Sequence, residues 1–152
     1  MHKFTEGRPL RLGGITVPSP QGLAGHSDAD VVLHAVCDAL LGAAGLGDIG
    51  QLFPSSDPTY KDMDSRLLLG AVAARLSEAG WHILNIDTVI IAEQPRLSPY
   101  YAAMREAIAT VLHLSADQVS IKATTPEGLG ALGRAEGIAA YAVALLARAD
   151  RQ

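Results

Sequence analysis

The stretch HSDADVVLHAVCDALLGAAGLGDIG, residues 26–50, decides how this chain is organised because it predicts one long, well-bounded helix. Apolar residues recur at helical spacing from 28 to 44. Ser27 stands before them as the candidate N-cap, and Asp30 follows three positions later as its capping-box partner. Gly45 comes directly after the last periodic residue and ends the predicted helix.

Three polar residues interrupt the apolar pattern of this helix. Asp30, His34 and Asp38 recur every four residues and therefore line one helical face. Burying such groups without partners costs about 1–3 kcal/mol each, so we expect them to be exposed, hydrogen-bonded to one another or engaged with a metal or ligand. The two carboxylates suit the orientation of a metal-binding imidazole, although a solvated helix face is the simpler alternative. His2 is a second candidate ligand, and a solvated chain end is its alternative.

The rest of the chain predicts further strands and helices around this one. In the first half, the expected elements are a hairpin over 8–18 that turns at Gly13 and Gly14, the helix described above, a loop over 48–63 and a helix over 64–79 capped by Asp64. In the second half, they are a strand over 81–92, a helix to about 112 with Ser98 as its N-cap and Pro99 as its first residue, a strand over 119–123, a glycine-rich loop over 128–137 and a final apolar run over 138–147. The alanines of the final run favour helix, whereas its alternation allows a strand.

These elements predict a single domain over residues 1–152 of the α+β class, in which a mixed β-sheet carries helices packed on one face. Such a sheet cannot cover both of its faces alone. We therefore expect the chain to form an oligomer.

Composition excludes several classes of protein. Apolar residues make up 49% of the chain and charged residues 18%, which is typical of globular enzymes and too apolar for a disordered chain. The formal net charge of -4 argues against nucleic acid as a partner. The single Cys37 excludes an internal disulfide, and the first residues show neither a signal peptide nor a membrane-length apolar run. We expect a cytoplasmic protein without a membrane partner.

A second polar segment follows the predicted strand over 119–123. Thr124, Thr125 and Glu127 place two hydroxyls and a carboxylate at the end of that strand, where a nucleotide phosphate and its magnesium could be held. A polar turn is the simpler alternative for this segment taken alone. The glycine-rich loop that comes next lacks a Walker pattern, which excludes a P-loop.

Taken together, five stretches of the chain resemble the 2-C-methyl-D-erythritol 2,4-cyclodiphosphate synthases. The stretches are HSDADVVLHAVCDALLGAAGLGDIG, LFPSSDP, AEQPRL, IKATTPEGLG and GRAEGIA. The resemblance covers nearly the whole chain, in order. It implies a homotrimer with sheets around a threefold axis, active sites between adjacent subunits and a small-molecule, CDP-linked substrate.

The same resemblance implies two divalent cations. Zinc, or another transition metal, is held by an Asp-x-His pair and a histidine on a helix. His34 matches the helix ligand and His2 matches the histidine of the pair, with Met1 at the intervening position. The aspartate is therefore expected just before the first residue, at a truncated N-terminus. The second cation, Mg²⁺ or Mn²⁺, binds the substrate diphosphate, and its carboxylate ligand matches Glu127.

Substrate contacts also follow from the resemblance. It assigns phosphates to His26 and Ser27, and the methylerythritol to Asp48 and Gly50. It assigns the diphosphate to Thr124 and Thr125, and the cytosine to residues 92–97, mainly through backbone groups. Arg134 and Glu136 match a charged pair near the trimer axis. The complete expected set is His26, Ser27, Asp48, Ile49, Gly50, Phe53, Asp57, Ala92, Pro95, Arg96, Leu97, Thr124, Thr125, Glu127 and Arg134.

The implied activity is that of a metal-dependent phosphorus–oxygen lyase of the non-mevalonate isoprenoid pathway, which releases CMP. No protein nucleophile is needed for this reaction. His26 and Thr125 are the expected catalytic residues, through hydrogen bonds that strengthen as the transferring phosphorus becomes planar. One alternative is a catalytically impaired trimer that binds a CDP ligand without a complete zinc site. The other is a metal-dependent hydrolase that transfers the phosphoryl group to water.

Overall fold

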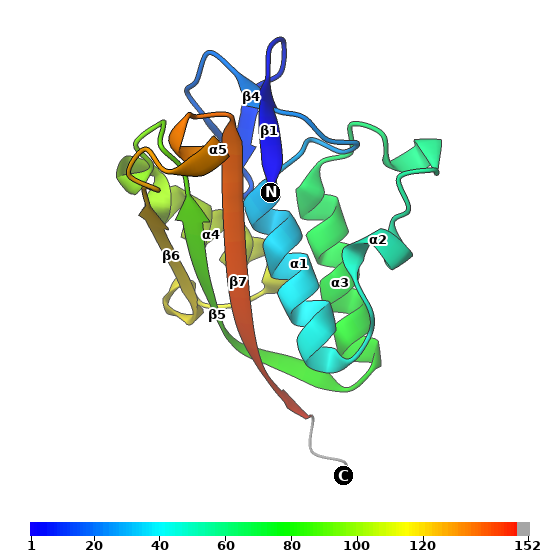
Figure 1. Cartoon of the computed structure of the whole chain (residues 1–152). Helices are drawn as coiled ribbons and strands as arrows, with labels where there is room; N and C mark the ends of the chain where they lie inside the picture. Colours follow the sequence, from blue (N-terminus) through cyan, green and yellow to red (C-terminus); the bar gives the residue numbers. More distant parts are fainter. Residues whose placement is uncertain (149–152) are drawn as a thin grey trace.

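The computed structural model describes residues 1–148, and a five-stranded mixed sheet runs through its centre (Figure 1). Its strands, in spatial order, are β4 (Gly22–Leu23), β1 (His2–Thr5), β7 (Gly137–Arg148), β5 (Trp81–Ile91) and β6 (Val119–Thr124). Strands β5 and β6 are parallel, and the other neighbours are antiparallel. The final apolar run is therefore a strand, because β7 pairs with β5 along nearly its whole length.

A separate hairpin confirms the predicted turn at its two glycines. Strand β2 (Leu10–Leu12) pairs with β3 (Ile15–Val17), and only Gly13 and Gly14 separate them. Their φ angles are 60° and 83°, which a two-residue turn between antiparallel strands requires and which glycine adopts without strain.

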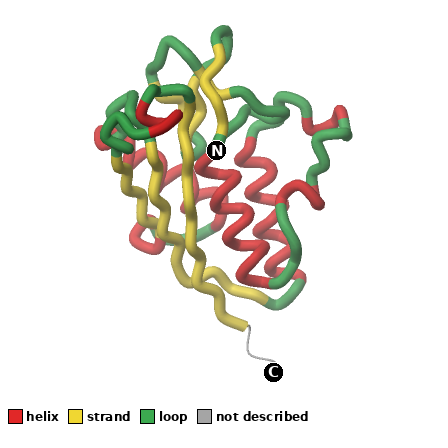
Figure 2. The backbone as a smooth tube through the Cα atoms, viewed as in Figure 1, coloured by secondary structure: helices red, strands yellow, loops and turns green. Residues whose placement is uncertain are grey.

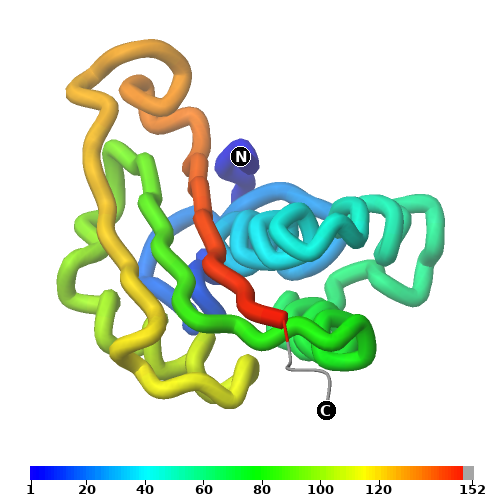
Figure 3. The backbone as a smooth tube through the Cα atoms, turned by 90° about the horizontal axis from the view of Figure 1, so that it is seen from below, coloured from blue at the N-terminus to red at the C-terminus, as the bar shows by residue number. Residues whose placement is uncertain are grey.

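Three long helices pack against the sheet, and in Figures 1 and 2 two of them stand to the right of β7 while the third passes behind the strands. They are α1 (Val31–Ala44), α3 (Ser65–Glu78) and α4 (Tyr101–Leu112). Seen from below, α1 and α3 run side by side (Figure 3). Within the described residues no helix is long and apolar enough to cross a membrane.

Short helical turns lie between the long elements, two of them in the loop predicted over 48–63 and one in the glycine-rich loop predicted over 128–137. They are α2 (Ile49–Leu52), α5 (Gly130–Gly133) and the 3₁₀ turns η1 (Pro58–Tyr60), η2 (Ser98–Tyr100) and η3 (Ala116–Gln118). The loop predicted over 48–63 thus contains two ordered turns. Each is capped by an aspartate at its N-terminus, Asp48 for α2 and Asp57 for η1.

The two faces of the sheet differ in burial. Ile86 and Ile90 on β5 are fully buried against the helices, which confirms that helices pack on one face. On the opposite face Tyr141 and Val143 of β7 are 64% and 71% exposed. The uncovered face is therefore apolar at its centre.

The predicted caps of two helices were wrong. Helix α1 begins at Val31 with Asp30 as its N-cap, and the Ser27 hydroxyl instead accepts a hydrogen bond from the Ala29 backbone N–H. The reason is the backbone of Ala29, whose φ of 60° breaks the helical path before residue 30. Ser98 likewise does not cap a helix, because it lies in the 3₁₀ turn that leads into α4.

Candidate functional site

Two histidine rings meet where strand β1 passes the first turns of helix α1. The Nε2 atom of His2 lies 3.0 Å from the Nδ1 atom of His34, and the rings stand at 77° to each other. Burial lowers the pKa of both imidazoles, and the neighbouring His2 contributes to lowering that of His34 to about 4. Both rings are therefore neutral near pH 7, which is the form that binds metal ions.

This pair of nitrogens fits a divalent transition metal. Imidazole nitrogens bind zinc at about 2.0–2.1 Å, so two of them on a tetrahedral ion lie about 3.3 Å apart. The two nitrogens lie 3.0 Å apart, so they would have to separate only slightly to bind the same ion. Within residues 1–148 no third histidine, cysteine, aspartate or glutamate joins the two rings. The described part of the chain thus offers two protein ligands.

The other nitrogen of His34 contacts hydroxyl groups. Its Nε2 atom lies 3.0 Å from the Ser65 hydroxyl oxygen and 3.1 Å from that of Ser27. The Ser65 hydroxyl in turn donates to the Asp28 carboxylate at 2.5 Å. The prediction that Asp30 and Asp38 orient the imidazole was therefore wrong, since serines and Asp28 do so.

Asp30 serves a structural purpose although it lies on the same helix. Its fully buried carboxylate accepts hydrogen bonds from the backbone N–H groups of Gly13 at 2.9 Å and Gly14 at 2.7 Å. It also accepts from Val32 at 3.1 Å and Leu33 at 3.0 Å. Burial raises the pKa of Asp30 to about 6, against the opposing effect of these donors. Asp30 thus fastens the β2–β3 hairpin to the start of α1.

Asp38 holds the segment that follows α1. It lies at the surface, and its carboxylate accepts a hydrogen bond from the Ile49 backbone N–H at 2.8 Å. This bond fixes the first residue of α2 relative to α1. The side chain therefore positions neighbours of the candidate site without contacting the histidines.

A cavity of about 260 Å³ opens beside the paired histidines. It brings together several residues expected to bind the phosphates and the methylerythritol. Its lining residues are His2, His26, Ser27, His34, Ile49, Gly50, Phe53, Ser55 and Leu68. The Nε2–H of His26 donates to the backbone carbonyl of Asp57 at 3.1 Å, which anchors the ring on the η1 loop.

The carboxylates of Asp48 and Asp57 lie outside this lining. Each caps a short helical turn and accepts a backbone N–H hydrogen bond there. The side chain of Gln51 is the main cause that lowers the pKa of Asp48, and the Thr59 backbone N–H is the main cause for Asp57. Both carboxylates are therefore ionised near pH 7.

A second cavity, of about 220 Å³, lies at the carboxyl ends of the parallel strands β5 and β6. It contains the residues named from the AEQPRL segment, Ala92, Pro95, Arg96 and Leu97, but not Gln94 of the same segment. Its lining residues are Ala92, Glu93, Pro95, Arg96, Leu97, Ser98, Tyr101, Ala123, Thr124 and Thr125. The Gly128 backbone N–H donates to the Glu93 carboxylate at 3.2 Å and so joins the two loops that form this cavity.

Glu127 and Arg134 line neither of these two cavities. Glu127 has a left-handed φ of 50°, its backbone N–H donates to the Thr125 hydroxyl oxygen at 3.2 Å, and its carboxylate forms no ion pair within residues 1–148. Arg134 is paired with Glu136, as predicted, with 2.6 Å between Nε and Oε1.

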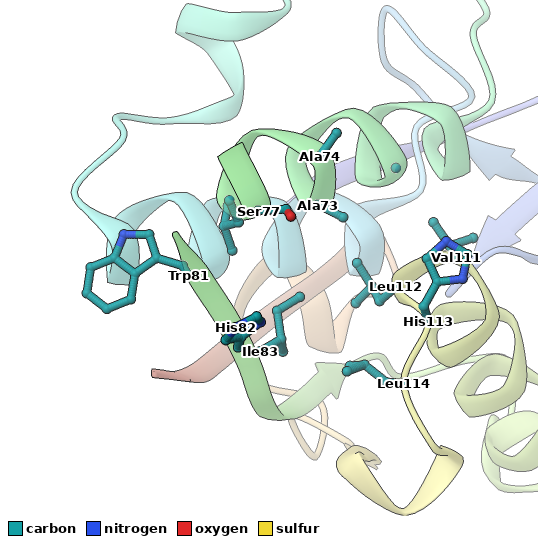
Figure 4. A pocket seen from close by; sticks show the side chains of 12 residues that line it. Ala73, Ala74, Ser77, Trp81, His82, Ile83, Val111, Leu112, His113 and Leu114 are labelled. Atoms are coloured by element: carbon teal, nitrogen blue, oxygen red, sulfur yellow. The ribbon is translucent and has the colours of Figure 1, made fainter. Parts of the chain in front are cut away.

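The two cavities lie toward opposite edges of the sheet. His2 is on β1 and Thr124 is on β6, and β7 and β5 separate those strands. At about 4.8 Å per strand, the two strands are about 14 Å apart. A further cavity of about 430 Å³ lies between α3, β5 and the end of α4, around Trp81 and His113 (Figure 4). It contains none of the predicted site residues.

Three polar or aromatic residues near these cavities were not predicted from sequence. Asp28 and Ser65 hold His34, whereas Tyr101 lines the second cavity. Asp28 was visible as a polar residue inside HSDAD. Ser65 gave no signal, because a serine beside the capping Asp64 is ordinary at the start of a helix.

Comparison with known proteins adds independent information. The model of the YgbB family matches residues 1–147. The 2-C-methyl-D-erythritol 2,4-cyclodiphosphate synthase of Syntrophomonas wolfei is 58% identical over 98% of this chain and 95% of its own length. A solved structure of a synthase of the same name with bound CDP has a TM-score of 0.87 at 37% identity, over 96% of this chain and 95% of that one. The bifunctional IspDF of Campylobacter jejuni has a TM-score of 0.93 at 42% identity, where 97% of this chain covers 40% of that longer chain.

Proposed function

The chain belongs to the YgbB family and has the function of a 2-C-methyl-D-erythritol 2,4-cyclodiphosphate synthase, and we propose that it works with a divalent metal bound by His2 and His34. The observation that supports the metal is the pair of neutral imidazole nitrogens that face each other at 3.0 Å. Such a cation would offset negative charge on the substrate diphosphate. The comparisons do not favour the alternative of an impaired CDP-binding trimer.

The proposed substrate is 4-diphosphocytidyl-2-C-methyl-D-erythritol 2-phosphate. An oxygen of its 2-phosphate bonds to the β-phosphorus while the bond from that phosphorus to the bridging oxygen breaks. CMP leaves with the bridging oxygen, and the cyclic diphosphate remains. The attacking phosphate is already anionic at neutral pH, so the enzyme has to reduce charge repulsion and hold an in-line geometry. This reaction is that of a phosphorus–oxygen lyase.

Hydrogen-bond donors of the chain suit these two tasks. The Asp57 carbonyl accepts the Nε2–H of His26, so only Nδ1 of His26 is left for the substrate phosphates, and it can donate to them in the form of the ring that also carries hydrogen on Nδ1. The Thr125 hydroxyl oxygen accepts the Glu127 N–H, which leaves the Thr125 hydroxyl proton to donate to a phosphate oxygen. The exposed Glu127 carboxylate is the proposed ligand of a second cation, Mg²⁺ or Mn²⁺.

Thr125 offers a direct test of this role. A hydrogen bond made mainly in the transition state contributes to turnover more than to binding. Thr125→Ala is therefore expected to lower kcat at least about tenfold with a smaller change in KM. Steady-state kinetics that show an unchanged kcat would remove Thr125 from the mechanism.

We further propose a homotrimer in which the histidine cavity of one subunit meets the second cavity of its neighbour. Two features support it: the cavities of one chain lie toward opposite edges of its sheet, and the uncovered sheet face is apolar around Tyr141 and Val143. Val143→Lys would place a charge in this interface and is expected to produce monomers and abolish turnover. Leu67→Lys is the matched control, because Leu67 is 64% exposed on α3, away from that face. Light scattering after size exclusion measures the outcome, and an unaltered mass for Val143→Lys would contradict the proposal.

Phosphorus NMR of the purified chain with this substrate, zinc and magnesium tests the reaction itself. The proposed synthase yields CMP and a cyclic diphosphate. A hydrolase would yield CMP and a methylerythritol that carries two separate monophosphates, and a binding protein would leave the substrate unreacted. A cytoplasmic location remains a prediction that fits an enzyme of precursor synthesis.

A further inference from the structure

The contacts of His34 determine which of its two nitrogens carries hydrogen. We propose that Ser65 and Asp28 are positioning residues that hold His34 as the tautomer with hydrogen on Nε2, so that the Nδ1 lone pair is free for a metal ion. This inference concerns the chain without metal, and it rests on the proposed function only for its consequence. His34, Ser65 and Asp28 come from α1, the start of α3 and the segment before α1, so the fold itself assembles the set.

The hydrogen bonds of Ser65 determine which nitrogen of His34 carries hydrogen. A serine hydroxyl has one proton, and the Ser65 hydroxyl donates it to Asp28 Oδ1 over 2.5 Å. The Ser65 oxygen can then only accept from His34 Nε2, which lies 3.0 Å away. His34 Nε2 must therefore carry hydrogen. Its Nδ1 atom is left as the acceptor that faces His2.

The direction of this chain is fixed at Asp28. Its Oδ2 atom accepts from the Ser65 backbone N–H at 3.1 Å and lies 3.9 Å from Arg11 Nε. Its Oδ1 atom accepts from the Asp30 backbone N–H at 3.2 Å in addition to the Ser65 hydroxyl. All of these neighbours are donors, so Asp28 acts only as an acceptor. Ser65 is fully buried, which removes water as a competing partner for its hydroxyl.

Ser27 provides the contrast. Its hydroxyl oxygen lies 3.1 Å from the same His34 nitrogen, almost as close as that of Ser65. It accepts from the Ala29 backbone N–H at 3.3 Å, and no acceptor within residues 1–148 fixes its proton. Ser27 can therefore donate to or accept from His34, and it does not select a tautomer.

Nitrogen NMR of the metal-free protein at pH 7.5 tests this difference. Long-range ¹H–¹⁵N spectra distinguish protonated from unprotonated ring nitrogens, and His34→Asn identifies the His34 signals. The wild type is expected to show hydrogen on Nε2. Ser65→Ala should give a mixture of tautomers and lower zinc affinity about 10–100-fold in a chelator competition, the usual cost of losing a group that orients a metal-binding histidine. Ser27→Ala should preserve the tautomer and change zinc affinity less than about twofold.

Asp28→Ala tests the other end of this chain of contacts, because it removes the acceptor of the Ser65 proton. The Ser65 hydroxyl can then donate to His34 Nε2 or accept from it. We therefore expect a mixture of tautomers in this variant, as in Ser65→Ala. Circular dichroism confirms that each variant is folded.

The outcomes separate this inference from the proposed function. Hydrogen on Nδ1 in the wild type would overturn it, and so would an unchanged tautomer and zinc affinity in folded Ser65→Ala or Asp28→Ala. If the predicted tautomers appear but the wild type makes no cyclic diphosphate, the proposed function fails and the positioning role stands.

Discussion

Asp30 and His34 stand one turn apart on helix α1, and their surroundings are opposite. Both oxygens of Asp30 are engaged by backbone N–H groups of the hairpin and of the helix itself. His34 has one nitrogen held by hydroxyls, whereas its other nitrogen faces only a second imidazole. Residues of the same polar pattern thus serve a structural purpose at one position and form a candidate metal site at the next.

A structural polar group and a candidate metal site differ in how many of their lone pairs lack a hydrogen-bond donor. A buried carboxylate with all its acceptors used stabilises one backbone arrangement. A buried neutral imidazole that directs a lone pair at another imidazole is poised to bind a cation. This comparison makes distinct predictions for the residues of the helix face.

The largest effect is expected at Asp30. Asp30→Ala leaves the N–H groups of Gly13 and Gly14 buried without an acceptor and removes the helix cap. At about 1–3 kcal/mol for each of the two unsatisfied donors and about 0.5–2 kcal/mol for the cap, the free energy of unfolding should fall by at least about 2.5 kcal/mol. Urea titration at a fixed protein concentration measures it. A loss below about 1 kcal/mol would mean that Asp30 does not hold the hairpin.

The next largest effect is expected at His34, where the affinity for zinc should change more than the stability of the fold. His34→Ala removes one of the two described ligands, so zinc affinity should fall by at least about 100-fold, beyond the effect of losing an orienting neighbour. The free energy of unfolding without metal should change less than in Asp30→Ala. Chelator competition and urea titration give the two values. Equal zinc affinity in wild type and variant would place the metal elsewhere.

A smaller effect is expected where Asp30 meets the hairpin turn. Gly13 has a φ of 60°, and an added Cβ would lie 2.8 Å from the Met104 side chain. Gly13→Ala should therefore lower the free energy of unfolding by about 2 kcal/mol. Thermal unfolding followed by circular dichroism measures it. Gly70→Ala is the control, because an added Cβ would make only an ordinary contact, 3.9 Å from Val111, inside helix α3, where alanine is preferred.

The smallest effect is expected at the third polar position. Asp38 is exposed and contributes one hydrogen bond, to the Ile49 backbone N–H. Asp38→Ala should cost at most about 1 kcal/mol of unfolding free energy. Because Ile49 lines the histidine cavity, KM for the substrate should rise modestly while kcat is retained. A loss in stability as large as that of Asp30→Ala would contradict the claim that Asp38 contributes less to folding than Asp30 does.

Local pattern was sufficient to predict most elements of the fold. The hairpin glycines, the helix that Asp64 caps and the strand over 81–92 are signalled by turn chemistry and periodicity, and the structure confirms them. The sequence of the final run over 138–147 did not determine whether it forms a helix or a strand. Its alanines favour helix, but pairing with β5 makes it a strand, and that pairing joins residues far apart in the chain.

The candidate site was predictable in part as a residue set but not as a set of hydrogen bonds. His2, His26 and His34, which the resemblance named, line one cavity, whereas Glu127 and Arg134 line neither cavity of the candidate site. The roles of Asp30 and Ser65 could not be predicted, because they depend on a hairpin and a second helix that tertiary packing brings to α1. Spacing shows that Asp30 and His34 share a face, but it does not show what lies opposite each.

An anomalous difference map from zinc-soaked crystals of this protein tests the central claim most directly. The account predicts a peak between Nε2 of His2 and Nδ1 of His34, with both imidazoles within about 2.0–2.1 Å of the ion. A map without a peak at this pair, or with zinc bound only at other residues, would contradict the claim that these histidines form the metal site.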